Sequence, residues 1–315
     1  MPERVFVVRE GDGATVDAIV ARAGEDARAI DEGRVFVGPR RARRGDAVRV
    51  GDAVRVVARR EVREVDASIH VLHRGGGLLA VDKPAGISTI PDTHDAEGSL
   101  LFRAARATGE DPAALHATSR LDRGVSGVVV FATTARAREQ LQNARASGRY
   151  FRLYAAIASP APAPADGEWT APIGRARDPR KRAVNGRDAT DARTRYRTVA
   201  VAGSAAGGTA RAPNAGSAAL LAIEPVTGRT HQIRVHASHA GAPLLGDRDY
   251  GLPGGSSRTL VLESGKVLAL DRVALHCARV RVDGMLDVRA PIPAALRAWW
   301  EALGGGNAWT VFERG

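Results

Sequence analysis

Cysteine is nearly absent from this chain of 315 residues, in which Cys277 is the single thiol. One cysteine excludes an internal disulfide framework and is typical of proteins that work in a reducing compartment. The sequence also lacks any apolar run near the roughly 20 residues that would span a bilayer. No long apolar stretch follows the charged residues Glu3 and Arg4, so no signal peptide is predicted. We therefore expect a cytoplasmic protein that does not associate with membranes.

The usual patterns of metal and nucleotide sites are missing too. His231 and His236 are five residues apart, and His236 and His239 are three apart, with no cysteine or acidic residue at ligand spacing. Neither a P-loop nor a G-x-G-x-x-G motif follows a suitable strand. The sequence therefore predicts no bound metal and no cofactor.

Positive charge is in excess. Lysine and arginine number 46 against 35 acidic residues, which gives a formal net charge of +11. Such an excess attracts the phosphates of nucleic acids whatever their sequence. The chain is also rich in alanine, glycine and valine, a composition typical of a GC-biased genome, and this offers a second explanation for the many arginines. Charge favours RNA binding, and composition bias remains the alternative.

One short segment carries most of the chemical information. Residues 119–127 read S-R-L-D-R-G-V-S-G and lead into the apolar run 128–131, which predicts a turn that feeds a buried strand. Asp122 lies between two arginines, and positive neighbours favour the charged form of a carboxylate. The glycines let another backbone or a substrate approach. Such a carboxylate can act as a nucleophile or an electrostatic stabiliser, although an Arg–Asp pair that closes a surface turn is the simpler explanation of this motif taken alone.

Further motifs follow in a recognisable order. Residues 149–157 read as a strand whose two-residue period puts Arg152 and Tyr154 on one face. The order R-L-D-x-x-x-S-G, R-x-Y-x-A, T-G-R-T-H-Q-I-R-V-H, G-D-x-x-Y-G and L-H-C resembles the RluA-type family of pseudouridine synthases, which isomerise uridine in ribosomal or transfer RNA. The resemblance covers roughly residues 68 to 300. Ser119 and Val125 depart from the family, which commonly has His and Thr there.

The resemblance implies a cofactor-free reaction that breaks the N1–C1′ bond of uridine, turns the base and joins C5 to the same sugar carbon. Asp122 matches the essential carboxylate, which either attacks the sugar or base or removes the 2′ proton to give a glycal. Tyr154 matches the tyrosine that packs on the target base and takes the C5 proton. Arg234 matches the arginine that pairs with the aspartate, and its guanidinium fork would hold that carboxylate. His231 and Gln232 are expected to brace their loop.

Four more residues are implied in substrate binding. Arg120 matches a residue that fills the space left when uridine leaves the base stack, an extrusion that costs a few kcal/mol. Leu275 fits the apolar wall of the base pocket. Lys83 lies in a K-P-x-G turn that the resemblance places at the rim of the cleft, where its ammonium would contact a phosphate, although a purely structural turn is equally consistent. Arg229 belongs to the T-G-R-T-H block.

Residues 1–60 are predicted to form a separate module. Residues 15–23 show a helical pattern with apolar residues on one face, and residues 33–38 and 48–57 read as short alternating strands with glycine turns. The sequence E-G-R-V-F-V-G followed by V-x-V-G-D-x-V-x-V is similar to the S4 RNA-binding domain. The resemblance implies RNA docking by a basic surface made of Arg34, Arg40, Arg41, Arg43 and Arg44. The alternative is a solvated basic loop with no binding role, because runs of charged residues usually lie in such loops.

Residues 68–315 are predicted to form the catalytic domain. Its fold class is α+β: a mixed, mostly antiparallel curved sheet with flanking helices and a catalytic cleft. Residues 133–147 show a helical pattern, residues 58–68 read as a linker, and residues 203–217 read as a flexible insertion. A doubly wound parallel sheet is disfavoured, because residues 171–236 leave little room for helices between strands.

Two other functions stay open. A non-catalytic RNA-binding protein would keep the basic surfaces, but it would not need Asp122, Tyr154 and Arg234 together. An N-glycosidic hydrolase that uses Asp122 would break the same bond and release free uracil. We expect a monomer that acts on ribosomal or transfer RNA without an obligatory protein partner, and the sequence does not name the RNA or the uridine.

Overall fold

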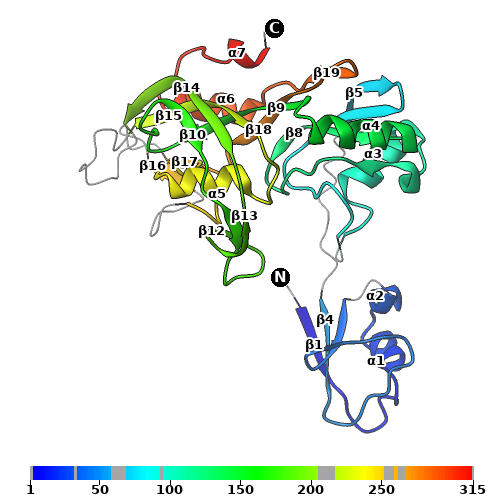
Figure 1. Ribbon diagram of the computed structural model, residues 1–315. Coiled ribbons are helices and arrows are strands. Elements are labelled where there is room, and N and C mark those ends of the chain that lie inside the picture. The colour runs from blue at the N-terminus through cyan, green and yellow to red at the C-terminus, as the bar shows by residue number, and fades with distance from the viewer. Residues whose placement is uncertain are drawn as a thin grey trace. The chain divides into compact units, whose positions relative to one another are not determined.

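The computed structural model describes residues 3–31, 34–57, 69–92, 95–204, 217–251, 259–261 and 267–313 (Figure 1). The chain divides into two compact units, residues 1–66 with 92–96 and residues 67–91 with 97–315. The linker predicted at 58–68 lies wholly outside the described residues, and so does most of the insertion predicted at 203–217. No described helix is long and apolar enough to cross a membrane.

The first unit is a four-stranded antiparallel sheet with two short helices. Its strands are β1 (Glu3–Val7), β2 (Val35–Val37), β3 (Arg40–Arg41) and β4 (Ala53–Val57), in the order β1-β4-β2-β3. Its helices are α1 (Val16–Arg22) and α2 (Arg28–Asp31).

The local predictions for this unit are confirmed in part. Helix α1 buries Val16, Ile19 and Val20, and Thr15 caps it by accepting a hydrogen bond from the Ala18 N–H. The strand predicted at 48–57 is shorter than expected. Only β4 pairs with neighbouring strands, because the residues before it form a turn in which Gly51 has a φ of 94°.

The second unit is built on a ten-stranded sheet. Its main path runs β10-β14-β15-β9-β18-β8-β6-β5, with β19 beside β18 and β7 beside β8. The strands are β5 (His70–Gly75), β6 (Leu78–Lys83), β7 (His116–Ala117), β8 (Ser126–Ala132), β9 (Tyr150–Ala158), β10 (Asp166–Trp169), β14 (Thr194–Ser204), β15 (Ser217–Pro225), β18 (Leu275–Val282) and β19 (Leu286–Arg289). Every neighbouring pair is antiparallel except β18 and β8. The predicted α+β fold with a mixed, mostly antiparallel sheet is confirmed.

Helices cover both faces of this sheet (Figure 1). Helices α3 (Leu100–Thr108), α4 (Ala135–Ala146) and α5 (Gln232–His239) contribute to the core on one face, while α6 (Ala294–Ala302) and α7 (Thr310–Glu313) contribute to the core on the other. Residue Leu141 of α4 is fully buried, as the helical pattern predicts. Strand β9 serves both cores, because Tyr154 faces one and Ala155 the other.

Smaller elements complete the unit. They are the 3₁₀ helix η1 (Pro112–Ala114), a three-stranded sheet of β11 (Ile173–Arg175), β12 (Arg182–Val184) and β13 (Arg187–Thr190), and the pair β16 (Thr259–Val261) and β17 (Val267–Ala269).

The parallel contact of β8 with β18 sets the position of the loop that carries Asp122. Gly127 pairs with Cys277, and Cys277 pairs with Tyr154 on the other side. Gly127 has a φ of 114°, and a Cβ there would lie 2.2 Å from the carbonyl oxygen of Cys277. Only glycine allows this approach. The start of β8, the start of β18 at Leu275 and the middle of β9 therefore meet in one region of the sheet.

Candidate active site

Asp122 and Arg234 come together although 112 residues separate them in the chain. Arg234, on α5, donates a hydrogen bond from Nη1 to Oδ2 of Asp122 at 3.0 Å. The Asp122 side chain lies in the loop before β8 and is 24% exposed, whereas the Arg234 side chain is 9% exposed. A buried cation therefore holds a carboxylate that a substrate can still reach.

The guanidinium fork of Arg234 holds a different carboxylate. Nε and Nη2 donate to the two oxygens of Asp247 at 2.8 and 2.7 Å, and Nη2 also reaches Asp249 at 2.7 Å. The expectation that the fork would hold Asp122 is wrong, because Asp122 receives a single hydrogen bond. Asp247 is buried and belongs with Asp249 to the G-D-x-x-Y-G motif. Sequence reasoning missed both, although a buried arginine needs compensating partners, and this need was the available signal.

Three carboxylates thus surround one guanidinium. Burial opposes the charge on Arg234, but the hydrogen bonds and charges of Asp247, Asp122 and Asp249 outweigh it and raise the pKa of Arg234 above its usual range. The ring of Tyr250 lies 4.9 Å from the guanidinium carbon. The site therefore contains a permanent cation, fixed mainly by the buried Asp247.

His231 borders Asp122 from the start of α5. Its Nδ1 lies 2.7 Å from the hydroxyl of Tyr250, and its Nε2 lies 3.8 Å from Oδ2 of Asp122. Burial lowers the pKa of His231 despite the nearby charge of Asp122. The neutral form of the ring is therefore favoured, and Arg234 remains the cation that pairs with Asp122. The expected bracing role is consistent with the bond to Tyr250.

Lys83 is not a phosphate contact, which corrects the role that the resemblance implies. Its side chain is fully buried, and Nζ donates to the carbonyl oxygens of Pro84, Asp122, Arg123 and Val125 at 2.7–3.3 Å. Burial lowers the pKa of Lys83 to about 7. The structural alternative therefore holds, and Lys83 positions the loop that carries Asp122.

Tyr154 and Leu275 lie on the sheet face below the site. Both are buried in the same core as Leu121 and Ile233, which neighbour Asp122 and Arg234 in the chain. The Tyr154 hydroxyl makes no hydrogen bond with Asp122 or Arg234. Burial, and next the neighbouring Cys277 thiol, raise the pKa of Tyr154 well above its usual range, so the phenol stays protonated.

Neither arginine beside Asp122 in the chain pairs with it. Arg123 donates to the carbonyl oxygen of Gly86 at 3.2 Å. Arg120 is exposed, and within the described part of the chain it forms no hydrogen bond or ion pair. The arginine that forms an ion pair with Asp122 is therefore Arg234 and neither of the two flanking arginines. Arg120 remains available to a substrate.

Gln232 braces the T-G-R-T-H loop, as expected. Its Oε1 accepts hydrogen bonds from the Arg229 N–H and the Thr227 hydroxyl at 2.9 and 2.6 Å, while Nε2 donates to Thr194 at 2.9 Å. Arg229 is exposed, and its Nε donates to the carbonyl oxygen of Asp191 at 2.9 Å. The guanidinium of Arg229 thus ties two loops together and still faces solvent.

The predicted RNA-docking arginines of the first unit are partly neutralised. Arg40 pairs with Asp46 at 3.0 Å, and Arg44 pairs with Asp31 at 2.7 Å. Residues 1–57 contain eleven arginines, no lysine and ten acidic residues, which is a net charge of +1. Most of the positive charge of the chain therefore belongs to the second unit.

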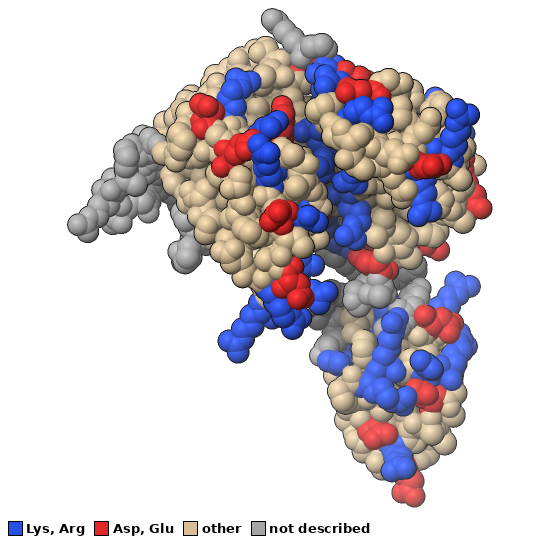
Figure 2. Space-filling model, in the orientation of Figure 1, with Lys and Arg blue, Asp and Glu red and all other residues tan. Residues whose placement is uncertain are grey.

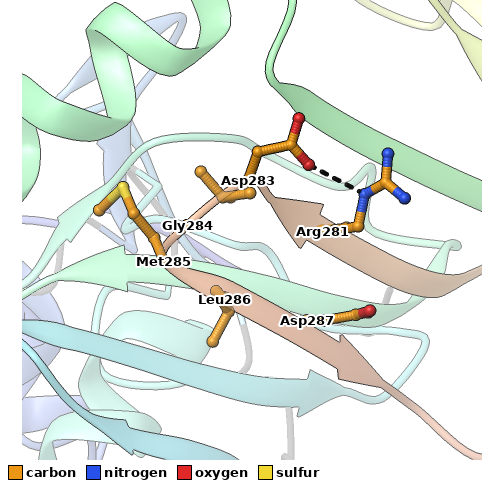
Figure 3. Close-up of a pocket in the computed structure, with 7 residues that line it drawn as sticks. Arg281, Asp283, Gly284, Met285, Leu286 and Asp287 are labelled. Carbon is orange, nitrogen blue, oxygen red and sulfur yellow. Dashed lines mark ion pairs between the residues drawn. The ribbon is translucent and has the colours of Figure 1, made fainter.

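A pocket of about 410 Å³ lies at the turn between β18 and β19 of the second unit (Figure 3). Its charged side chains are already paired, Arg281 with Asp283 at 3.1 Å and Asp287 with Arg279. The turn follows Val282, seven residues along β18 from Leu275, which is about 23 Å in an extended strand. We therefore take the region around Asp122, and not this pocket, as the candidate active site. No described group of three or more His, Cys, Asp or Glu side chains could hold a metal ion.

Comparison with known proteins identifies the relatives of this chain. Residues 77–239, which include Asp122, Tyr154 and Arg234, match the model of the RNA pseudouridylate synthase family. The chain is 32% identical over 292 residues to a ribosomal large subunit pseudouridine synthase D of Xanthomonas campestris, covering 87% of this chain and 82% of that protein. It is 31% identical over 185 residues to the dual-specificity RNA pseudouridine synthase RluA of Salmonella typhimurium, covering 58% and 77%. The solved structure of human RNA pseudouridylate synthase domain containing 4 is similar, with a TM-score of 0.56, 25% identity, and coverage of 75% of this chain and 93% of that one.

Proposed function

The chain belongs to the RNA pseudouridylate synthase family, and on that premise we propose that it isomerises specific uridines of ribosomal RNA, with Asp122, Tyr154 and Arg234 as catalytic residues. The family is one of isomerases that act on uridine in RNA. The name of the Xanthomonas relative, which refers to the large ribosomal subunit, supports ribosomal RNA over transfer RNA. The observation that carries the proposal is the contact of a buried, fixed Arg234 with a partly exposed Asp122.

Asp122 is suited to act on the sugar or base because one of its oxygens is free. Oδ2 accepts the bond from Arg234, while Oδ1 has no hydrogen-bond partner among the described residues. In the proposed reaction the N1–C1′ bond of uridine breaks, the C5–C1′ bond forms, C5 loses a proton and N1 gains one. Nucleophilic attack and removal of the 2′ proton both need an ionised carboxylate, and Arg234 donates a charge-assisted hydrogen bond to Oδ2 of that carboxylate.

Tyr154 is proposed to pack against the target base and to take part in the removal of the C5 proton. Because burial keeps its phenol protonated, the hydroxyl can accept that proton only as its own proton leaves. Arg120, exposed beside Asp122, is proposed to fill the base stack after uridine is extruded. We also propose that residues 1–60 form an S4-like module that docks RNA, and that the protein is a cytoplasmic monomer.

The proposal is tested with Asp122→Asn, assayed on transcripts of ribosomal and transfer RNA labelled with tritium at uridine C5. The variant should bind RNA like the wild type and lose more than about 10³-fold in rate, because the amide keeps the shape of the side chain and removes the charge. Asp166→Asn is the matched control, since Asp166 is exposed and unpaired among the described residues. Activity of Asp122→Asn within about tenfold of the control would exclude Asp122 as the essential group.

The same assay separates the alternative functions. Release of free uracil without pseudouridine would indicate an N-glycosidic hydrolase, and RNA binding by the wild type without turnover would indicate a non-catalytic binding protein. Pseudouridine in the transfer RNA transcripts alone would move the substrate from ribosomal RNA to transfer RNA.

A further inference from the structure

Two arginines converge on Gly228, which lies in the loop just before α5, the helix that carries Arg234. Arg145 comes from the end of α4 and Arg152 from β9. A Cβ built on Gly228 would lie 3.1 Å from Nη2 of Arg145 and 3.6 Å from Nη1 of Arg152. Both guanidinium groups are half-buried, and Gly228 is exposed. The two positive charges therefore lie next to exposed backbone at Gly228.

Neither guanidinium is neutralised within the described chain. Arg145 donates to the carbonyl oxygen of Thr118, and Nη2 of Arg152 donates to the carbonyl oxygens of Pro225 and Thr227 at 3.0 and 2.8 Å. No described carboxylate pairs with either group. Burial, and next the charge of Arg152, lower the pKa of Arg145. Two half-buried positive charges that lie side by side without a counter-ion destabilise the folded protein, and a bound anion would offset that cost.

Unused hydrogen-bond donors accompany these charges. Nε of Arg152 is buried and has no hydrogen-bond partner, and the N–H of Gly228 donates to no group among the described residues. A buried donor without an acceptor is costly, so a structure that keeps one at a basic site invites an external acceptor. Glycine at position 228 also matters sterically, because any side chain there would rest on the two guanidinium groups.

We propose that Arg145, Arg152 and the Gly228 backbone form a binding site for a phosphodiester of the RNA substrate, next to the nucleotide that is modified. This inference rests on the proposed function. A phosphodiester fits because its two unbridged oxygens accept several charge-assisted bonds from planar guanidinium donors. The site is tied to Thr118, four residues before Asp122, and to Thr227, seven residues before Arg234, so a phosphate bound there fixes the strand beside the catalytic carboxylate.

The charge distribution is consistent with this path for RNA. Figure 2 shows Lys and Arg side chains gathered in a hollow between the part of the second unit built from α5 and β14 and the part built from α3 and α4. A phosphate site contributes both affinity and register, because contacts to the backbone position an RNA without reading its sequence.

The test measures RNA binding by the full chain across a salt series, together with KM and kcat on a large-subunit ribosomal RNA transcript. Arg145→Gln should raise Kd and KM about tenfold and leave kcat within about threefold. The slope of log affinity against log salt should become shallower by about 0.7–0.9, the value for one neutralised phosphate. Arg138→Gln is the matched control, since Arg138 lies on the same helix, is exposed and has no partner among the described residues. Its slope, Kd and KM should stay at wild-type values.

Gly228→Ala provides a second variant that changes no charge. Its methyl group should block the site, so that both affinity and salt slope fall as in Arg145→Gln while the melting temperature stays within about 2 °C of the wild type. If Arg145→Gln fails to fold, this variant decides the matter, and unchanged affinity and slope in Gly228→Ala would overturn the proposal.

The remaining outcomes separate the phosphate site from the proposed function. Equal slopes for Arg145→Gln and Arg138→Gln, in a wild type that forms pseudouridine, would refute the phosphate site and leave the enzyme assignment intact. A wild type that forms no pseudouridine, but whose salt slope still falls in Arg145→Gln and Gly228→Ala, would support the site and refute the proposed function.

Discussion

Replacing Asp247 by asparagine removes the carboxylate that fixes Arg234. Asp247 accepts both Nε and Nη2 of Arg234, and its Oδ1 also accepts the backbone N–H groups of Asp249 and Tyr250 at 3.0 and 3.2 Å. An amide can keep one oxygen in place for the backbone and for one arginine donor. Its NH₂ group then faces the second arginine donor, where two donors oppose each other.

The expected loss of stability follows from the partners that remain. Breaking a buried ion pair by removing one partner costs about 3–5 kcal/mol when the other charge is left alone. Arg234 is not left alone, because Asp122 and Asp249 still accept hydrogen bonds at 3.0 and 2.7 Å. We therefore expect a loss of about 2 kcal/mol, which corresponds to a fall of about 4–8 °C in the melting temperature of a unit of this size.

The effect on the reaction should exceed the effect on binding. Arg234 would turn toward Asp122 and Asp249 once its fork is released, and the single bond that orients Asp122 would shift. A misplacement of about 1 Å at a reacting group costs on the order of 100-fold in rate. We expect kcat to fall by about that factor, with KM within about threefold of wild type.

Thermal unfolding and single-turnover release of tritium from C5-labelled uridine RNA measure the two effects. Asp249→Asn is the matched control: Asp249 contacts the same Nη2 at the same 2.7 Å, but its side chain is 44% exposed, against 1% for Asp247. The control should lose less than about 1 kcal/mol and less than about tenfold in kcat. Equal effects of the two variants on stability and rate would refute the view that the buried fork positions the site.

Three other results are expected. Lys83→Met should destabilise the protein by about 2 kcal/mol in urea unfolding and slow the reaction, because four carbonyl oxygens around the Asp122 loop lose their donor. Wild-type stability of this variant would refute the view that Lys83 positions the loop. Tyr154→Phe should keep RNA affinity and stall tritium release, and a normal rate would assign the C5 proton step to another residue. Deleting residues 1–60 should leave the maximal rate on a short RNA similar and lower the affinity for large RNA. The slope of log affinity against log salt should become shallower by about one unit for each phosphate that the protein no longer binds. Unchanged affinity and slope would mean that this module does not dock RNA.

Local patterns in the sequence predicted local structure well. The spacing of Val16, Ile19 and Val20 predicted the face that α1 buries, and the position of Leu141 predicted the inner face of α4. These predictions succeed because burial of a helix face depends on intervals of three and four residues that are visible in the chain. The closely spaced strands also predicted a mostly antiparallel sheet.

Motifs identified the family and brought attention to Asp122 and Arg234, but they did not identify what holds those residues. The sequence indicated that the flanking arginines would keep Asp122 ionised, and the resemblance left Lys83 open between a phosphate contact at the cleft rim and a structural turn. In the structure Arg123 bonds Gly86, and Lys83 is buried against the carbonyl oxygens of the loop. Adjacent residues in a turn point in different directions, so proximity in the chain does not predict an ion pair.

Long-range partners were decided by tertiary structure alone. The contact of Arg234 with Asp122 spans 112 residues, and it depends on the parallel pairing of β8 with β18 and on the burial of Asp247 beneath α5. The approach of Arg145 and Arg152 to Gly228 likewise joins a helix, a strand and a loop. Register between distant strands follows from how two faces of a sheet fill with side chains, a collective property of packing that no short stretch of sequence contains.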